Sequence, residues 1–291
     1  MIEMNIGNKT GLYCIIGMPA HHSLSPDIQN AMFKALHMDA AFFAFDVPAE
    51  MLEAAVKGMK AYGIIGMTLT SPHKEAVMKY VDSIDNDAKK LGAVNTLVIR
   101  NGKFYGYNTD HPGFVESLKK FKSSFNVDYS IIGAGGAARA CAYGVLRSKM
   151  ANKITIINRT IKHAEELKAI LKSDFKNADI RTLKLGTVDA DKAVENSGVV
   201  VNATNITLEN KRNTPVKKNS LHKGQIVFDA NYVPINNKLL SDAKAKGCIT
   251  INGLELLVNQ GVVAFELFTG KKADYKIMKK AAMDSIRMSN H

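Results

Sequence analysis

The chain has 291 residues, of which 46% are hydrophobic, and a formal net charge of +12 at pH 7. This length can bury a large core as two domains of ordinary size, and no apolar run approaches the ~20 residues that a membrane span needs. The lysines are spread over predicted helix faces, without a basic tail, a zinc knuckle or an aromatic RNA-binding pattern, so we expect a solvated basic surface and no nucleic-acid partner.

The first third of the chain alternates between predicted strands and helices. Pro26 suits the first position of the first helix and Ser25 suits its cap. Asn101-Gly102 stands between alternating residues and predicts a β-hairpin. The other predicted elements are strands at 11–17, 42–47 and 64–70, helices at 27–36 and 48–59, and a helix that opens after Ser71-Pro72. This alternation predicts an α/β domain with its own sheet.

The chain is expected to cross into a second α/β domain near Asn108-Thr109-Asp110. The stretch from 205 to 220 is polar, and we expect a mobile loop there. The predicted elements are helices at 113–121 and 161–172, strands that begin at Tyr129 or lie at 153–158, 180–183, 199–204, 226–230 and 248–251, and two C-terminal helices after Gly253. Strands that alternate with helices in this way are typical of a parallel sheet.

A glycine-rich turn between a strand and a helix organises the second domain. Gly133-x-Gly135-x-x-Ala138 has the spacing of a dinucleotide-binding turn. Gly133 would allow the tight turn, Gly135 would let the backbone approach a pyrophosphate, and the small Ala138 would let the helix pack on the strand. The alternative is a Rossmann-like turn that binds nothing.

The end of the following strand favours NADP over NAD. Twenty residues after Ala138 the chain reads Asn158-Arg159-Thr160, where NAD-binding proteins tend to carry a carboxylate for the ribose hydroxyl. An arginine there suits a 2′-phosphate, which its planar guanidinium can bind through two hydrogen bonds.

Several side chains of the first domain are candidates for chemistry. Ser23 and Ser25 could donate to one carboxylate, although Ser25 could equally serve only as a helix cap. Lys74 lies in the first turn of a helix, an unfavourable place for a surface cation, and could transfer a proton. Asp110 could pair with Lys74 or cap the helix before Pro112. Asn95 could hold a substrate hydroxyl or a backbone turn.

In sequence order these segments resemble the shikimate dehydrogenase family, from about Leu12 to Gly270. The matching stretches are His22-Ser-Leu-Ser-Pro26, Thr70-Ser-Pro-His-Lys74, Gly92-Ala-Val-Asn-Thr96, Asn108-Thr-Asp110, Gly133-Ala-Gly-Gly-Ala-Ala-Arg139, Asn158-Arg-Thr160, Asn202-Ala-Thr204, Asp229-x-x-Tyr232-x-Pro234, Asn252-Gly-Leu254 and Gln260-Gly261. A single match would carry little weight, but their shared order identifies the chain as a member of the family.

The resemblance implies an NADP-dependent oxidoreductase that reversibly reduces 3-dehydroshikimate to shikimate in aromatic amino-acid biosynthesis. Lys74 and Asp110 would be catalytic. The residues implied for substrate are Ser23, Ser25, Thr68, Thr70, Asn95, Tyr232 and Gln260. Those implied for NADP are Gly133, Ala134, Gly135, Gly136, Ala137, Asn158, Arg159, Thr160, Lys162, Asn202, Ala203, Thr204 and Gly253.

The implied fold is α/β, with an N-terminal substrate domain and a Rossmann-like NADP-binding domain that has a mostly parallel, doubly wound sheet. We expect the substrate domain at 1–110, the NADP domain at 111–252, and helices from 253–291 packed back on the substrate domain. The partner would be the small-molecule substrate, and the protein a monomer or homodimer.

Two positions depart from the family pattern. Thr68 stands where an asparagine amide is usual, so it reaches less far towards a substrate. The second basic residue that often follows the family's phosphate-binding arginine, here Arg159, is represented by Lys162 or His163. A quinate or mixed quinate/shikimate dehydrogenase is therefore an alternative, and so is a non-catalytic NADP-binding regulator, although Lys74 and Asp110 are both present.

The cysteines and the N-terminus bear on the compartment. Cys14, Cys141 and Cys248 are far apart, in apolar or helical contexts, and lack the spacing of metal ligands. We expect buried thiols and no metal. Glu3 and Asn5 interrupt any basic-then-apolar signal pattern, so a cytoplasmic protein that avoids membranes is expected.

Overall fold

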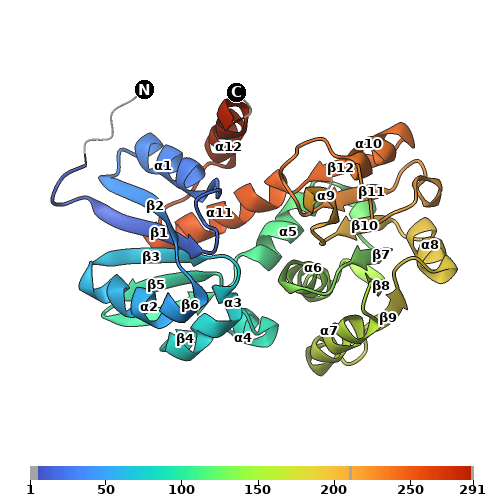
Figure 1. The fold of residues 1–291 in the computed structure, drawn as a ribbon, viewed down its shortest axis with the longest axis horizontal. Coiled ribbons are helices and arrows are strands. Elements are labelled where there is room, and N and C mark those ends of the chain that lie inside the picture. Colours follow the sequence, from blue (N-terminus) through green and yellow to red (C-terminus); the bar gives the residue numbers. More distant parts are fainter. Residues whose placement is uncertain (1–5, 210–211, 290–291) are drawn as a thin grey trace. The chain divides into compact units, whose positions relative to one another are not determined.

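The structure, a computed structural model, describes residues 6–209 and 212–289 (Figure 1). It divides the chain into two compact units, of which the first comprises Met1–Thr109 with Val258–His291 and the second Asp110–Leu257. Each unit is built around its own six-stranded sheet. The predicted α/β fold class is confirmed.

The sheet of the first unit is mixed, with the order β2-β1-β3-β5-β6-β4. β1 pairs in parallel with β2 and β3, whereas β5 pairs antiparallel with β3 and β6. The strands are β1 Gly11–Gly17, β2 Ala40–Asp46, β3 Ile64–Leu69, β4 Ser83–Ile84, β5 Thr96–Arg100 and β6 Lys103–Tyr107. The helices are α1 Ser25–Ala35, α2 Leu52–Ala61, α3 His73–Ala76, α4 Asn86–Leu91, α11 Leu254–Thr269 and α12 Tyr275–Ser289, with short 3₁₀ helices at Ala49–Met51 and Val77–Tyr80.

The connection between β5 and β6 is the tight hairpin that the sequence predicts. Asn101 has φ 50° and Gly102 has φ 71°, so both central residues are left-handed. A turn of this kind matches the right-handed twist of the flanking strands, and asparagine followed by glycine is the pair that tolerates it best. The hairpin brings β5 and β6 into register from Thr96 opposite Tyr107.

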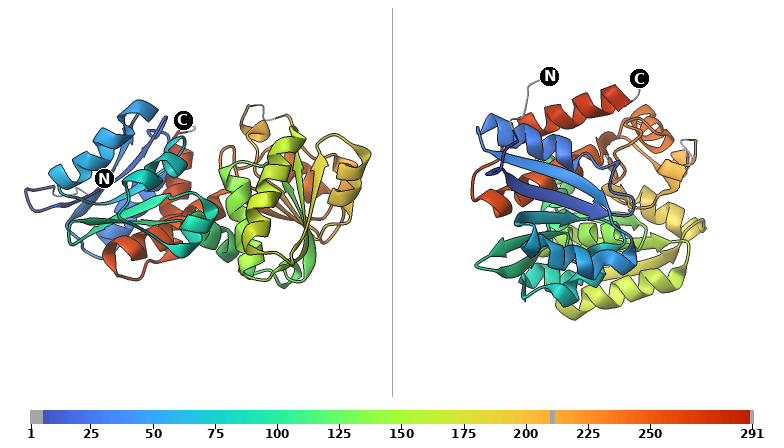
Figure 2. Two further views of the ribbon diagram at one scale, coloured as in Figure 1. Left: turned by 90° about the horizontal axis from the view of Figure 1, so that it is seen from below. Right: turned by 60° about the vertical axis from the view of Figure 1, so that its left-hand side comes forward.

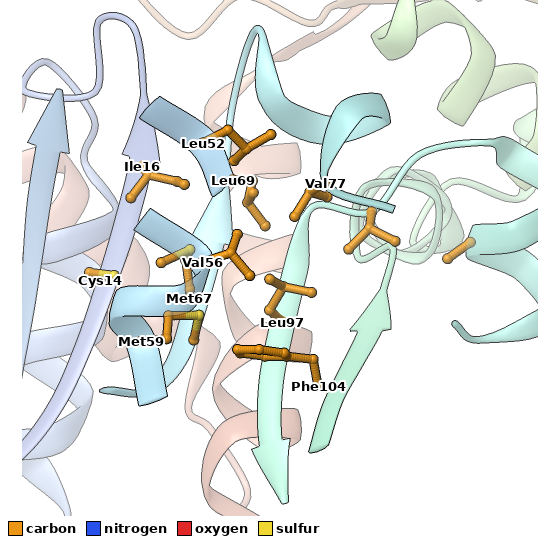
Figure 3. Close-up of a cluster of buried hydrophobic side chains, with 12 residues drawn as sticks. Cys14, Ile16, Leu52, Val56, Met59, Met67, Leu69, Val77, Leu97 and Phe104 are labelled. Atoms are coloured by element: carbon orange, nitrogen blue, oxygen red, sulfur yellow. The ribbon is translucent and has the colours of Figure 1, made fainter. Parts of the chain in front are cut away.

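The core of the first unit lies under α2 (Figure 3). Leu52, Val56 and Met59 repeat at helical spacing on one face of α2, and all three are buried. They pack against side chains of the sheet, which include Met67 and Leu97. Burial of this apolar face, more than helix propensity, stabilises a helix of only ten residues.

On the other side of this unit, α1 and α11 approach closely because one of them carries a glycine. A Cβ at Gly261 would lie 2.5 Å from Cδ1 of Ile28. The buried Gln29 donates its Nε2 to the carbonyl of Gly261 at 3.0 Å. These contacts fix the segment of α11 that carries Gln260.

The sheet of the second unit is wholly parallel, with the order β12-β11-β10-β7-β8-β9. The chain leaves β7 in one direction to β8 and β9, and returns to β10 on the other side of β7. The strands are β7 Val127–Ile132, β8 Ala151–Asn158, β9 Asp179–Lys184, β10 Val199–Asn202, β11 Ile226–Asp229 and β12 Ile249–Asn252. In doubly wound sheets, ligands bind at the carboxyl ends of the strands where the order reverses, here between β7 and β10.

Helices cover both faces of this parallel sheet (Figure 2). They are α5 Asp110–Lys119, α6 Gly136–Arg147, α7 Ile161–Asp174, α8 Val188–Glu195, α9 Ile206–Glu209 and α10 Lys238–Ala245, with short 3₁₀ helices at Lys122–Ser124 and Lys218–Ser220. One core joins Ile157 and Val200 of the sheet to Val194 of α8 and Leu239 of α10. The strands read as continuous apolar runs because both of their faces are buried.

The structure corrects several local expectations. Ser25 is the first residue of α1 and makes no side-chain cap, because Leu24 is the cap residue. The polar stretch 205–220 contains α9 and a 3₁₀ helix where a loop was expected, and its residues 210–211 lie outside the described residues. The short helices α4, α8 and α10 were not predicted. Cys14 and Cys141 are buried free thiols as expected, but Cys248 is only half-buried, and its Sγ contacts the carbonyl of His222 at 3.2 Å.

Candidate active site

Ser23 and Ser25 lie together in the turn before α1. The Oγ atoms of Ser23 and Ser25 are 3.1 Å apart, and the backbone N–H of Ser25 donates to Oγ of Ser23 at 3.1 Å. The preceding turn is held by Asp46 at the end of β2, which accepts from the N–H groups of Ala20 at 2.6 Å and His21 at 3.0 Å. The hydrogen bonds from Ala20 and from the His21 ring lower the pKa of Asp46. The fold therefore presents two neighbouring hydroxyls, the pair that a carboxylate can engage.

At the carboxyl end of β3, Thr68 carries an unused hydroxyl. The residue is buried, and its Oγ1 has no hydrogen-bond partner within the described residues. An unsatisfied buried hydroxyl costs roughly 1–3 kcal/mol, so such a group calls for an explanation. A role in ligand binding is one explanation, and it agrees with the site predicted for Thr68.

Thr70 and Lys74 follow on the segment after β3. The N–H of Thr70 donates to the carbonyl of Ile16 at 2.9 Å, and its carbonyl accepts from the N–H of His73 at 3.0 Å. Lys74 is the second residue of α3 and is half-buried. Its carbonyl accepts from the N–H of Val94 at 2.8 Å, which ties this backbone to the segment that carries Asn95.

Asn95 and Gln260, far apart in the sequence, are joined through Thr109. Nδ2 of Asn95 donates to Oγ1 of Thr109 at 3.1 Å, and the N–H of Thr109 donates back to Oδ1 of Asn95 at 2.8 Å. The hydroxyl of Thr109 also donates to Oε1 of Gln260 at 3.2 Å. All three residues are buried. The structure thus brings together two predicted substrate residues, and it shows that the amide of Asn95 also serves to hold a backbone turn.

Thr109 is a positioning residue that sequence reasoning did not single out. Its signal was its place inside the Asn-Thr-Asp stretch, from which only Asp110 was chosen. Its fully buried hydroxyl accepts from Nδ2 of Asn95 and donates to Oε1 of Gln260, so it orients both amides. Asp110, the next residue, is half-buried and opens α5 in the second unit. Burial raises the pKa of the Cys141 thiol, and the charge of Asp110 raises it further.

In the second unit, the glycine turn after β7 has the geometry of a phosphate cradle. Gly133 has φ 115°, and a Cβ there would lie 2.7 Å from the carbonyl oxygen of Ala203. Gly135 is the cap residue of α6 and Gly136 its first residue, and a Cβ on either would meet nothing within 4 Å beyond its chain neighbours. Ala134 is half-buried and Ala137 is exposed, so the start of α6 is open, while Ala138 is fully buried against the sheet. An open helix start with free N–H groups fits a pyrophosphate.

At the end of β8, the predicted phosphate clamp is exposed. Asn158 uses its Nδ2 to bind the carbonyl of Thr160 at 2.9 Å and so shapes the turn. Arg159, Thr160 and Lys162 are exposed around the first residue of α7. The cations are therefore available to an anion outside the sheet edge.

Asn202 is held by a buried carboxylate that the sequence reasoning did not name as functional. Oδ1 of Asp229 accepts from Nδ2 of Asn202 at 3.0 Å, and its Oδ2 accepts from Thr207 at 3.1 Å and Asn237 at 2.7 Å. Burial raises the pKa of Asp229, against the opposing effect of these hydrogen bonds. Oδ1 of Asn202 in turn accepts from the N–H and hydroxyl of Thr204. Asp229 thus fixes the side chain of Asn202, which in turn holds the Asn202-Ala203-Thr204 turn.

Two further predicted residues lie close to this turn. Gly253 is buried, and a Cβ there would lie 2.2 Å from the carbonyl oxygen of Ala230. Close packing is therefore by itself enough to require glycine at this position. Tyr232 is half-buried, and burial raises the pKa of its hydroxyl.

No group of three or more metal-binding side chains occurs among the described residues. In the part of the chain that the structure describes, no helix has the length and apolar character that crossing a membrane demands.

Comparison with known proteins gives a consistent pattern. Three family models match the chain: the shikimate dehydrogenase substrate binding domain at residues 15–97, shikimate / quinate 5-dehydrogenase at 116–246, and the shikimate 5′-dehydrogenase C-terminal domain at 253–283. The shikimate dehydrogenase (NADP(+)) of Methanococcus aeolicus is 40% identical over 285 residues, which cover 96% of this chain and 99% of that protein.

Solved structures agree with the sequence matches. A crystal structure of a shikimate dehydrogenase in complex with NADP+ superposes with a TM-score of 0.89 at 37% identity, covering 97% of both chains. The ligand-free 5-ketofructose reductase of a Gluconobacter strain superposes with a TM-score of 0.86 at 34% identity, covering 96% of this chain and 99% of that one. The same architecture therefore occurs in proteins named for different carbonyl substrates.

Proposed function

The chain belongs to the shikimate dehydrogenase family, and we propose that it reversibly reduces 3-dehydroshikimate to shikimate with NADPH, in aromatic amino-acid biosynthesis. The observation that carries the proposal is the pairing of two sets of groups in one chain. One is the open glycine turn with exposed cations at the end of β8, and the other is the set of neighbouring hydroxyls and amides in the first unit, the Ser23–Ser25 pair and the Asn95–Thr109–Gln260 chain. The first suits a phosphorylated dinucleotide and the second a polyhydroxylated acid.

In this proposal each unit serves mainly one ligand, and Asp110 and Tyr232 of the second unit also serve the substrate. The first unit, with the C-terminal helices, binds the substrate, and the second binds NADP. Ser23 and Ser25 bind the ring carboxylate through their hydroxyls, an arrangement supported by the 3.1 Å distance between their Oγ atoms. Thr68, Thr70, Asn95, Tyr232 and Gln260 contact the remaining substrate groups.

The chemistry of this chain's own residues is proton transfer and charge stabilisation. NADPH, when bound, supplies the hydride. Lys74 donates a proton to the carbonyl oxygen of the substrate as negative charge develops there, and it takes the proton back in the reverse direction. Asp110 accepts a hydrogen bond from the hydroxyl so formed. General acid catalysis of this kind contributes about 10²–10⁴-fold in rate.

Binding of NADP is assigned to three features of the second unit. Gly133, Ala134, Gly135, Gly136 and Ala137 form the cradle for the pyrophosphate. Asn158, Arg159, Thr160 and Lys162 hold the ribose 2′-phosphate. The Asn202-Ala203-Thr204 turn and Gly253 border the nicotinamide, and the hydrogen bonds of Asn202 to Asp229 and Thr204 support a rigid border.

A cofactor-reduction assay with four substrate and cofactor combinations tests the proposal. We expect turnover of shikimate with NADP, and much slower turnover with NAD. Turnover of quinate at a similar rate would indicate the mixed quinate/shikimate dehydrogenase, a possibility raised by Thr68. Reduction of 5-ketofructose by NADPH, without turnover of shikimate, would overturn the assignment of substrate. An absence of turnover in every combination, with NADP still bound, would favour a non-catalytic regulator.

The free thiols support a reducing compartment. Cys14 and Cys141 are buried and unpaired, and Cys248 is also a free thiol. We therefore assign the protein to the cytoplasm, as the sequence predicts.

A further inference from the structure

The carboxyl ends of β8 and β9 carry a group of exposed cations that lack carboxylate partners. Arg159 and Lys162 follow β8, and Lys184 ends β9. None of the three forms an ion pair with another residue among those described. Other basic residues of the same unit do: Lys153 lies 2.6 Å from Asp128, and Lys217 lies 2.7 Å from Asp191. The positive charge at this edge of the sheet is thus left uncompensated by the protein.

The strand register places Lys184 beside the predicted phosphate clamp. Lys184 pairs with Asn158, the residue directly before Arg159, across the parallel β8–β9 ladder. The N–H of Leu185 donates to the carbonyl of Asn158 at 3.0 Å and continues that pairing by one residue. Neighbouring strands lie about 4.8 Å apart, so a lysine side chain from this position can reach the space outside the Arg159 turn.

The direction of the side chain follows from the core packing. Ile157 and Leu183 are paired in register and both pack in the core beneath α8 and α10. Because side chains alternate along a strand, Asn158 and Lys184 both lie on the opposite face, where α7 packs on β8 and β9. α7 begins at Ile161, so Lys184 and the exposed Arg159-Thr160 turn share one corner of the sheet.

The backbone of Lys184 is held in place from the other side as well. Its carbonyl accepts from Oγ1 of Thr187 at 2.8 Å, and the same hydroxyl caps α8 by accepting from the N–H of Ala190 at 3.3 Å. The strand end is therefore anchored at both Asn158 and Thr187. Only the side chain of Lys184 remains free to adjust to a ligand.

We propose that Lys184 is a specificity-determining residue that binds the ribose 2′-phosphate of NADP together with Arg159. Arg159 offers a planar fork of donors and Lys184 a compact ammonium on the neighbouring strand, so a phosphate dianion between them gains two charge-assisted contacts. The inference rests on the proposed use of NADP. It also explains how the chain holds the 2′-phosphate where the family's second basic residue is represented only by Lys162 or His163.

Binding of adenosine 2′-monophosphate and adenosine 5′-monophosphate to the full-length protein tests Lys184 directly. Replacing Lys184→Ala is expected to weaken binding of the 2′-monophosphate about three- to tenfold and to leave the 5′-monophosphate unchanged. Lys184→Arg should retain most of the affinity because it keeps the charge. Lys176→Ala is the matched control, because Lys176 is also exposed and in the same unit but lies beyond the C-terminal end of α7.

A double variant distinguishes a shared ligand from a general loss of charge. If both cations bind one phosphate, the effects of Arg159→Ala and Lys184→Ala should be clearly non-additive, and both should shrink at high salt. Equal weakening by Lys184→Ala and Lys176→Ala, or unchanged affinity for the 2′-monophosphate, would overturn the proposal. The binding assay does not depend on shikimate turnover, so it tests the contact of Lys184 with the 2′-phosphate even if the protein does not turn over shikimate.

Discussion

Lys74 is the side chain on which the proposed proton transfer depends. Its α3 backbone is tied to Val94 by a 2.8 Å hydrogen bond, so the position is held independently of the side chain. We predict that Lys74→Ala lowers kcat by about 10²–10⁴-fold and changes substrate KM far less.

Steady-state kinetics with shikimate and NADP measure this split, and Lys89→Ala provides the control. Lys89 is an exposed lysine of α4 in the same unit. A Lys74→Ala variant with undiminished kcat would rule out the proton donor.

Thr68 allows stability and function to be separated in one substitution. Its buried Oγ1 lacks a partner within the described residues, so its desolvation cost is uncompensated by the protein. Thr68→Val keeps the shape and removes the hydroxyl. We predict an unchanged or higher free energy of unfolding, by up to about 1 kcal/mol, together with a raised KM for the substrate.

Denaturant unfolding and initial-rate measurements on the same preparation test both halves of this prediction. A destabilised variant with normal KM would indicate that the hydroxyl has a structural partner instead. A raised KM without loss of stability would assign Thr68 to the substrate.

At the scale of elements, the turn between β7 and α6 contains two glycines that are required for different reasons. Gly133 needs its positive φ of 115° and would bring a Cβ to 2.7 Å from the carbonyl of Ala203, whereas a Cβ at Gly135 meets no such obstacle. We predict that Gly133→Ala destabilises the protein by about 2–3 kcal/mol, and that Gly135→Ala leaves stability within about 0.5 kcal/mol.

Both variants should bind NADP more weakly. In Gly135→Ala the reason is that the added methyl lies where the pyrophosphate would approach. Thermal unfolding without ligand and titration with NADP separate the two effects. Equal stability of the two variants would contradict the assignment of strain to Gly133.

Asp229 links four elements through one carboxylate. It accepts from Asn202 at the end of β10, Thr207 in α9 and Asn237 before α10, and lies itself at the end of β11. Asp229→Asn replaces one acceptor oxygen by an amide NH₂ group. This buried donor would then face another buried donor that now binds the carboxylate. We predict a loss of about 2–4 kcal/mol in the free energy of unfolding.

The raised pKa of Asp229 adds a pH dependence of known sign. A carboxyl group whose pKa is higher in the folded state stabilises the fold most when protonated, below its ordinary pKa. This contribution is lost as pH rises through the raised value. Denaturant unfolding across this range should show a slope in the unaltered protein that Asp229→Asn lacks, and identical slopes would show that Asp229 does not titrate there.

The elements that could be predicted from sequence are those whose signal is local. Asn101-Gly102 specifies its hairpin because few other pairs tolerate two left-handed residues. The prediction that Ser25 caps α1 was wrong, because Ser25 is the first residue of the helix and its N–H donates to Oγ of Ser23. Residue preferences cannot distinguish a serine in this role from a serine that caps a helix. The helices α4 and α8 are short, with few apolar residues to show a period.

The candidate site shows the same division. The glycine turn could be predicted because its spacing occurs between a predicted strand and a predicted helix, with Asn158-Arg159-Thr160 at the end of the next strand. Thr109 and Asp229 could not, because their importance lies in contacts with Gln260 and Asn202, which are distant in sequence. Lys184 became visible only through the register of β9 against β8.

At the scale of the whole molecule, the net charge of +12 suits two anionic ligands, a carboxylic acid and a phosphorylated dinucleotide. Part of the basic surface is locally neutralised, as in the pair of Lys119 with Glu116 at 2.7 Å. Arg159 and Lys162 after β8 and Lys184 at the end of β9 have no such partner in the part of the chain that the structure describes. Long-range attraction therefore comes from the whole surface, while specific binding is left to a few uncompensated groups.

Each unit has its own sheet and its own hydrophobic core, so each ligand should protect mainly the unit that binds it. We predict that NADP slows amide hydrogen exchange at 133–138 and 158–160, and that shikimate slows it at 23–25, 68–74 and 95–109. At a free concentration of about 100 times Kd, amides that exchange only after ligand release should slow about 100-fold.

Hydrogen-exchange mass spectrometry with each ligand alone measures this pattern, with adenosine 5′-monophosphate as a control for the missing 2′-phosphate. Protection by NADP confined to the first unit would refute the division of ligands between the units. Protection at 158–160 by NADP but not by the 5′-monophosphate would place the 2′-phosphate beside Arg159, since only the phosphorylated ribose needs those cations.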